Sequence, residues 1–155
     1  MQKILDQIVE AISTSRDLYY QLVLLVGQSG SGKTDALQNI AEELGEFIVN
    51  VNLALSEELL ELTAKQRTLR LPGIFHQILE QGQTPIVLDN LEILFDKDLK
   101  QDPLRLLQKA SRSRTVVASW NGSYYDGKLR YADLGHPEYR IYDSVDALII
   151  KMEEV

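Results

Sequence analysis

Residues 27–34 read GQSGSGKT, and this octapeptide decides the fold. Two glycines five residues apart, followed by lysine and a hydroxyl residue, match the Walker A pattern G-x-x-x-x-G-K-S/T. Glycine lets the backbone N–H groups approach phosphate oxygens, the lysine supplies a charge to the β and γ phosphates, and the threonine hydroxyl suits Mg²⁺. The sequence therefore predicts a nucleoside triphosphate site. Its eight residues are Gly27, Gln28, Ser29, Gly30, Ser31, Gly32, Lys33 and Thr34.

The neighbouring segments favour this interpretation over an incidental Gly/Ser turn. Residues 21–26, QLVLLV, form a short apolar run of the strand type, and residues 35–44 favour a helix. A phosphate-binding loop needs a strand before it and a helix after it, because the helix N-terminus faces the anion.

Length and composition indicate one globular domain over residues 1–155. Apolar residues make up 45% and charged residues 25% of the chain, which are ordinary values for a water-soluble protein. No cysteine is present, which excludes disulfides, thiolate catalysis and zinc-thiolate sites. The first twelve residues lack a basic segment, and no apolar run is long enough to span a bilayer. We therefore expect a cytoplasmic protein without a membrane partner.

The charge balance argues against tight binding of duplex DNA by the monomer. The net charge is −7, whereas affinity for duplex DNA depends mostly on cations that neutralise phosphates. One local basic stretch, KASRSR at residues 109–114, follows a predicted helix. Cations at that place complement the helix dipole, which is the simpler interpretation of the stretch.

Apolar segments alternate with helix-forming segments along the chain, which predicts a parallel sheet covered on both faces. We expect strands at residues 21–26, 47–51, 84–89, 115–119 and 139–142. An N-terminal helix should bury Ile4, Leu5, Ile8, Val9 and Ile12, and further helices should cover residues 33–44, 56–65, 72–80, 102–110 and 143–152. Gly45 should end the second helix, and Ser56, Asp102 and Asp143 should cap theirs. Pro72 should begin a helix that ends before Gly82. The fold class is α/β, a three-layer αβα P-loop NTPase with a five-stranded, mostly parallel sheet.

A second motif supplies a metal ligand. Residues 86–89, IVLD, form an apolar strand that ends in an aspartate, as in a Walker B motif. Mg²⁺ takes oxygen ligands and keeps several waters, so the Asp89 carboxylate can orient a Mg²⁺-bound water beside Thr34. The two residues together predict a Mg²⁺ site. Aspartate is also common after strands as a turn residue, but its order after a P-loop favours the metal role.

The residue that follows departs from the usual pattern. Many ATPases of the AAA+ type place a glutamate directly after this aspartate, where it activates the attacking water, but here Asn90 follows and the nearest acid is Glu92. Two readings stay open. Either Glu92 reaches the γ-phosphate region, or hydrolysis is slow and the protein is a nucleotide-controlled switch. Glu92 could also be an ordinary acid in a first helical turn.

A polar residue at the end of the fourth strand is the next candidate. Residues 119–122 read SWNG, and Asn121 could bond the γ-phosphate or the attacking water and so report which nucleotide is bound. Asn-Gly is also a common turn dipeptide. The order of the elements favours the sensor role.

The motifs and later segments together resemble BrxF, the small P-loop protein family of type III BREX phage-exclusion loci. The resemblance is carried by GQSGSGKT, LDNLE at 88–92, ASWNG at 118–122 and LGHPEYR at 134–140, and it spans residues 3–143. It implies an AAA+-like ATPase core, a prokaryotic cytoplasm and partners among the other BREX proteins. It implies no particular biochemical role within that system.

Similarity to AAA+ ATPases carries a further expectation of self-association. In such assemblies an arginine from one subunit completes the neighbour's site, and the order of the elements makes Arg130 the first candidate, Arg140 the second and Arg114 the third. We expect an AAA+-like core without a lid domain. A lidless core leaves the nucleotide to be covered by neighbours or partners.

Three function classes follow from the sequence. The first is an ATPase or ATP-controlled switch in phage defence, with ATP and Mg²⁺ as cofactors. The second is a small-molecule or nucleoside kinase, although no arginine-rich lid is evident. The third is a nonhydrolytic adaptor whose shape depends on bound nucleotide.

Overall fold

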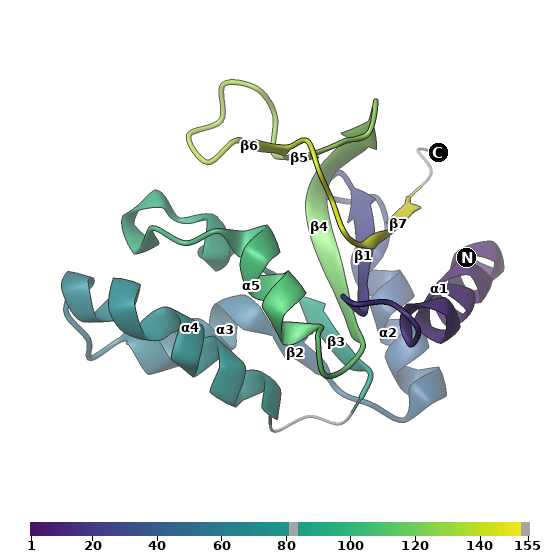
Figure 1. The fold of residues 1–155 in the computed structure, drawn as a ribbon, viewed down its shortest axis with the longest axis horizontal. Coiled ribbons are helices and arrows are strands. Elements are labelled where there is room, and N and C mark those ends of the chain that lie inside the picture. Colours follow the sequence, from purple (N-terminus) through teal and green to yellow (C-terminus); the bar gives the residue numbers. More distant parts are fainter. Residues whose placement is uncertain (81–83, 153–155) are drawn as a thin grey trace.

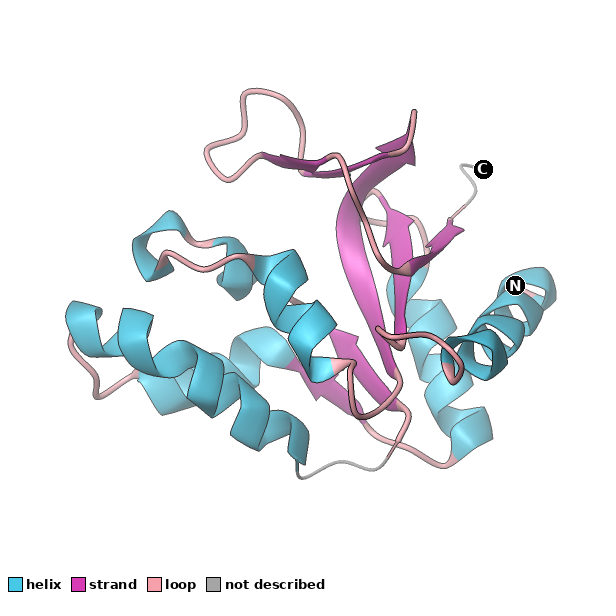
Figure 2. Ribbon diagram, in the orientation of Figure 1, coloured by secondary structure: helices cyan, strands magenta, loops and turns pink. Residues whose placement is uncertain are grey.

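The fold is a twisted sheet with helices on both faces, described for residues 1–80 and 84–152 in a computed structural model (Figures 1 and 2). Five strands lie parallel in the order β2-β3-β4-β1-β7, and two more continue from β4 as an antiparallel extension. The strands are β1 (Leu22–Gly27), β2 (Ile48–Asn50), β3 (Ile86–Asp89), β4 (Val116–Tyr125), β5 (Lys128–Tyr131), β6 (Arg140–Tyr142) and β7 (Leu148–Lys151).

The helices divide between the two faces of the sheet, and the two hydrophobic cores follow that division. Helices α1 (Gln2–Ser15) and α2 (Lys33–Leu44) pack on one face, where Val23 and Leu25 are buried. Helices α3 (Val51–Leu59), α4 (Ala64–Glu80) and α5 (Pro103–Ala110) cover the other face over Leu22 and Leu24. Alternate residues of a strand face opposite sides, so β1 contributes to both cores. The predicted three-layer α/β fold with a five-stranded parallel core is confirmed.

Several local predictions hold at helix ends. Gly45 adopts a left-handed conformation at the end of α2, where its N–H reaches the last carbonyls. Asp102 caps α5 by accepting the Arg105 N–H, and Pro103 occupies the first helical position. In the stripe predicted for α1, Leu5, Ile8 and Ile12 are buried, whereas Val9 remains 47% exposed.

The last predicted helix, residues 143–152, is wrong. Residues 148–151 of this segment form β7, which lies parallel to β1 with Val23 opposite Leu148 and Val26 opposite Lys151. The central strand β1 is buried and needs hydrogen-bonding partners on both sides, and this pairing outweighs the local helix signal. The fifth parallel strand is therefore β7, while the predicted strand at 139–142 is β6 of the antiparallel extension.

Two predicted helix starts are also wrong. Helix α3 begins at Val51, because the Asn50 side chain accepts the Leu53 N–H, so Ser56 lies inside the helix. Pro72 lies inside α4. A proline leaves the carbonyl four residues before it without its helical donor, and the Gln101 amide donates to that carbonyl, on Thr68, at 3.0 Å. Gly82, the expected end signal, lies outside the described residues.

Strand β4 runs past its predicted end at residue 119 and past the Asn121-Gly122 turn signal to Tyr125. The extension depends on Gly122, because a Cβ there would overlap the carbonyl oxygen of Arg130 on β5. The Trp120 indole N–H donates to the same carbonyl at 3.0 Å. Tyr131 of β5 stacks on Phe95 with ring centroids 3.4 Å apart, which joins the extension to the short 3-10 helix η1 (Glu92–Phe95).

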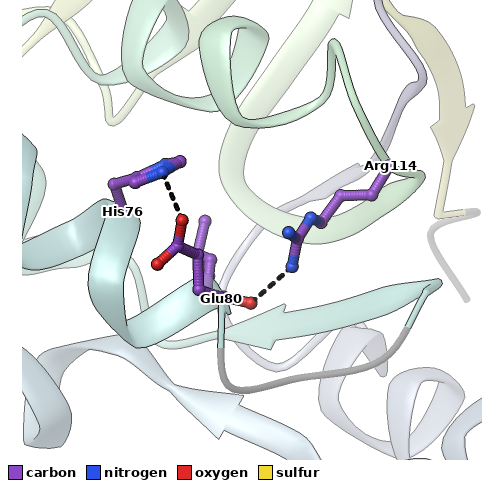
Figure 3. A network of polar contacts seen from close by, with 4 residues as sticks. His76, Glu80 and Arg114 are labelled. Atoms are coloured by element: carbon purple, nitrogen blue, oxygen red, sulfur yellow. Dashed lines mark hydrogen bonds and ion pairs between the residues drawn. The ribbon is translucent and has the colours of Figure 1, made fainter.

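Two of the three cations in the basic stretch at residues 109–114, Lys109 and Arg114, lie at or bond to the end of a helix. Helix α5 ends at Ala110 with Lys109 in its last turn, and a second 3-10 helix, η2 (Lys97–Leu99), precedes it. Arg114 donates to the Leu79 carbonyl in the last turn of α4 at 2.7 Å, beside the His76–Glu80 pair (Figure 3). Lys109 therefore lies at the helix end as predicted, whereas Arg112 lies over the Tyr19 ring at 4.2 Å and Arg114 acts on α4. None of the helices within the described residues is both long and apolar enough to cross a bilayer.

Candidate nucleotide-binding site

The glycine-rich loop connects β1 to α2 at the carboxyl edge of the sheet, where ligands of parallel α/β sheets bind. Gly30 and Gly32 have φ angles of 83° and 97°, a region that side-chain-bearing residues rarely adopt. Gly27 is needed for close approach, because a Cβ there would lie 2.5 Å from the Ser31 hydroxyl oxygen and 2.9 Å from Cβ of Met152. The loop conformation thus requires the glycines that the motif predicts.

Lys33 lies within the loop and is buried. Its ammonium donates to the carbonyls of Gly27 and Gln28 at 2.8 and 2.7 Å, and to the Ser31 hydroxyl at 3.4 Å. Burial lowers the pKa of Lys33, while the nearby carboxylates of Asp89 and Glu92 act in the opposite direction. The loop carbonyls thus hold this cation beside the glycine-rich loop.

Thr34 and Asp89 meet as the Mg²⁺ prediction requires. The Thr34 hydroxyl donates to Oδ2 of Asp89 at 2.8 Å, and the Ser119 hydroxyl donates to Oδ1 at 2.6 Å. The hydrogen bond brings together two oxygen donors of the kind that Mg²⁺ takes. Among the described residues there is no cluster of three or more His, Asp or Glu that could hold a metal. A site of two protein oxygens plus phosphate and water suits Mg²⁺.

The position after Asp89 explains the missing glutamate. Asn90 has a φ of 55°, a left-handed conformation that asparagine tolerates better than glutamate. Its carbonyl accepts the Asn52 N–H at 2.8 Å. The chain then turns into η1, whose first residue is Glu92, and both Asn90 and Glu92 line the cleft beside the loop.

Two asparagine amides hold the Glu92 carboxylate. Asn121 donates from Nδ2 to Oε1 at 2.7 Å, and Asn52 donates from Nδ2 to Oε2 at 3.0 Å. The Asn52 side-chain oxygen also accepts the Ile93 N–H at 2.7 Å. Asn121, predicted as a phosphate sensor, therefore contacts the candidate base, and both groups belong to one network with Asn52.

Sequence reasoning missed three residues of this site. Asn52 follows the second strand, and its polarity at the carboxyl edge of the sheet was an available signal. Ser119 lies in the quoted ASWNG segment, but nothing local marks its bond to Asp89. Met152 follows β7 and packs its side chain along Gly27 and Gly32. This contact depends on β7, where the sequence predicts a helix.

The cleft formed by these groups has a volume of about 270 Å³. Its lining comes from the loop, the start of α2, the end of β3, η1 and β4. The arginine candidates do not line it. The Arg130 guanidinium lies over the Tyr125 ring at 3.7 Å, Arg140 donates to the Gln101 carbonyl at 2.6 Å, and Arg114 donates to Leu79.

Comparison with known proteins gives a match at the level of structure. No family model matches the chain, and no curated protein is significantly similar to it. Among solved structures, the AMPPCP-bound DnaA from Aquifex aeolicus is similar, with a TM-score of 0.52 and 17% sequence identity. This likeness shows a shared fold, a parallel α/β sheet with helices on both faces. The match covers 96% of this chain and 44% of the DnaA chain, so the chain spans less than half of that protein.

Proposed function

We propose that this protein binds ATP with Mg²⁺ and acts as an AAA+-like ATPase or ATP-controlled switch. The observation that carries the proposal is the Thr34–Asp89 oxygen pair beside the buried Lys33, at the mouth of a glycine loop that opens a helix. The similar DnaA structure has AMPPCP bound, which supports a nucleotide in a fold of this kind.

The residues of the loop divide the binding between them. Backbone N–H groups of the loop and of the first turn of α2 bind phosphate oxygens, and Lys33 exchanges its bonds to the Gly27 and Gln28 carbonyls for bonds to phosphate. Thr34 and Asp89 hold Mg²⁺, which neutralises charge on the β and γ phosphates. Ser119 fixes the second carboxylate oxygen of Asp89 and so orients the first toward the metal.

For hydrolysis, we assign the role of general base to Glu92. Its carboxylate accepts the proton of the water that attacks the γ-phosphorus, and ADP and phosphate leave. Asn52 and Asn121 each donate to one carboxylate oxygen and so position Glu92 at the cleft. Because Asn90 stands where many AAA+ ATPases have the catalytic glutamate, we expect slow turnover by the isolated protein.

The same network links the nucleotide cleft to the antiparallel extension, which gives bound nucleotide a way to change that part of the fold. Glu92 begins η1, and Phe95 at the end of η1 stacks on Tyr131 of β5. A shift of Glu92 toward bound nucleotide would therefore move η1 and, through the stacked rings, the antiparallel extension. Arg130 belongs to this extension. It is partly exposed there and lies outside the nucleotide cleft of its own chain.

The proposal includes self-association, in which Arg130 of one copy contacts the γ-phosphate held by another. An arginine supplied in trans accelerates phosphoryl transfer by about 10³–10⁵-fold in the systems that use one. The setting we propose is the bacterial cytoplasm, in an anti-phage system of the BREX type with other BREX proteins as partners. This last part rests on the sequence resemblance to BrxF alone.

Single-turnover hydrolysis measured over a range of protein concentrations tests the proposal. We expect the rate per subunit to rise with concentration, and Arg130→Ala to lower it while ATP binding persists. A mixture of Arg130→Ala with Lys33→Ala should regain part of the activity, because each variant keeps the half-site that the other lacks. Arg70→Ala, an exposed arginine on α4, is the matched control. A concentration-independent rate, or a mixture without recovery, would contradict the trans mechanism.

A further inference from the structure

A groove between α4 and α5, on the side of the sheet away from α2, is unused by the proposed function. Its volume is about 560 Å³, and its lining includes Pro72, Gly73, Phe75, Arg105, Leu106 and Lys109. Apolar groups form most of the surface, and two cations stand at the rim. The groove therefore suits an apolar side chain that is flanked by acidic residues.

Gly73 keeps the groove open. Glycine is unfavourable inside a helix, yet Gly73 has no positive φ, and a Cβ there would meet nothing within 4 Å. Neither backbone geometry nor internal packing therefore requires glycine at this place. The absence of a side chain at Gly73 leaves space above the floor of the groove.

The cations at the rim are free to receive a partner. Arg105 and Lys109 are exposed and stand four residues apart on α5, and within the described residues neither side chain forms a hydrogen bond or an ion pair. The nearby acids are already engaged. Asp102 accepts the Arg105 N–H and the Tyr142 hydroxyl, and Glu80 pairs with His76 at 2.8 Å (Figure 3).

The complementary feature lies on the same chain. Phe47, in the connection between α2 and β2, is 90% exposed, and Glu42, Glu43 and Glu46 precede it within five residues. Helix α2 packs on the face of the sheet opposite α4 and α5 (Figure 1). Phe47 therefore cannot enter the groove of its own chain, whereas it is presented outward for another copy.

We propose that the α4–α5 groove receives Phe47 of a second copy of this chain, with Arg105 and Lys109 facing the glutamates beside it. The contact joins two different surfaces, so repetition gives a head-to-tail ring or filament instead of a closed two-fold dimer. The inference rests on the self-association in the proposed function and names a surface for it. The contact needs no nucleotide.

Analytical ultracentrifugation of the full chain without nucleotide tests the interface. We expect the average mass of the wild type to rise with concentration. Phe47→Ser and Gly73→Leu, which fills the groove, should each weaken association by roughly tenfold or more, as expected when an aromatic anchor loses its pocket. Leu134→Ser is the matched control, because Leu134 is 87% exposed on another part of the surface and should change nothing.

A mixture of the two interface variants makes the test specific for a head-to-tail contact. Phe47→Ser keeps an intact groove and Gly73→Leu keeps an intact Phe47, so the mixture should form dimers that grow no further. A wild type that stays monomeric, unchanged association of Phe47→Ser, or a mixture without dimers would overturn the proposal. The affinity of Phe47→Ser for Mg·ATP distinguishes failure of this interface from failure of the proposed function. We expect that affinity to equal the wild-type value. A wild type that does not bind ATP would refute the proposed function instead.

Discussion

Replacing the Glu92 carboxylate by an amide, Glu92→Gln, separates its chemical role from its structural one. The carboxylate accepts one amide N–H from Asn121 and one from Asn52. A glutamine side chain has one oxygen, so its own NH₂ group must face one of these two donors unless an asparagine amide turns over. The folded protein thus loses about one hydrogen bond, which costs about 1 kcal/mol.

The expected effect on catalysis is larger than the effect on stability. A loss of 1 kcal/mol shifts the melting temperature of a domain of this size by about 2–4 °C. Loss of a general base lowers the rate by roughly 10²-fold or more, which corresponds to about 2.7 kcal/mol of transition-state stabilisation. Binding of Mg·ATP should change little, because Lys33, Thr34 and Asp89 are untouched.

Single-turnover hydrolysis of ATP under saturating protein, together with calorimetric binding of Mg·ATP and thermal unfolding, measures the three effects separately. Glu57→Gln is the matched control, because it removes one exposed carboxylate from α3 without touching the cleft. Turnover of Glu92→Gln equal to that of the control would refute the base assignment and leave Glu92 a structural residue at the start of η1.

Three further predictions follow from the same geometry. Asn52→Ala should lower single-turnover hydrolysis by roughly tenfold with Mg·ATP affinity preserved, because positioning of a reacting group affects the rate and not phosphate binding; an unchanged rate would remove Asn52 from the site. In denaturant unfolding, Gly122→Ala should destabilise the fold by about 1–3 kcal/mol through overlap with the Arg130 carbonyl, whereas Gly73→Ala should stabilise it by roughly 0.5–1 kcal/mol; equal effects would contradict the packing described for β5. Burial, followed by the Asp102 carboxylate, raises the pKa of Tyr142 to about 12, whereas an unfolded tyrosine ionises near pH 10. The folded state therefore holds the proton longer, and the free energy of unfolding should fall as pH rises from about 10 to 12, with a flatter profile in Tyr142→Phe.

The parts of the site that the sequence predicts are those fixed by local chemistry. A glycine loop with Lys33 and Thr34 has a required backbone shape, and Asp89 at the end of an apolar strand belongs to the same edge of any parallel sheet. Parallel strands bring their carboxyl ends to one edge of the sheet, and the alternation of elements predicts that the strands are parallel.

The parts that the sequence does not predict depend on pairing over long distances. Residues 148–151 are apolar enough for a helix or a strand, and only the open side of β1 selects the strand. Asn52 reaches Glu92 because β2 pairs with β3 in one register and α3 starts at once after β2. No local pattern marks that contact. The signal of an Asn-Gly turn at residue 121 is overridden because β5 supplies a partner for β4.

Titration of the purified chain with ATP by calorimetry, with and without Mg²⁺, tests the central claim most directly. We expect one saturable site per chain, with higher affinity in the presence of Mg²⁺. Binding should be lost in a folded Lys33→Ala variant and kept in the exposed control Lys65→Ala. Absence of saturable binding by the folded wild type, or equal affinity in Lys33→Ala, would contradict that claim.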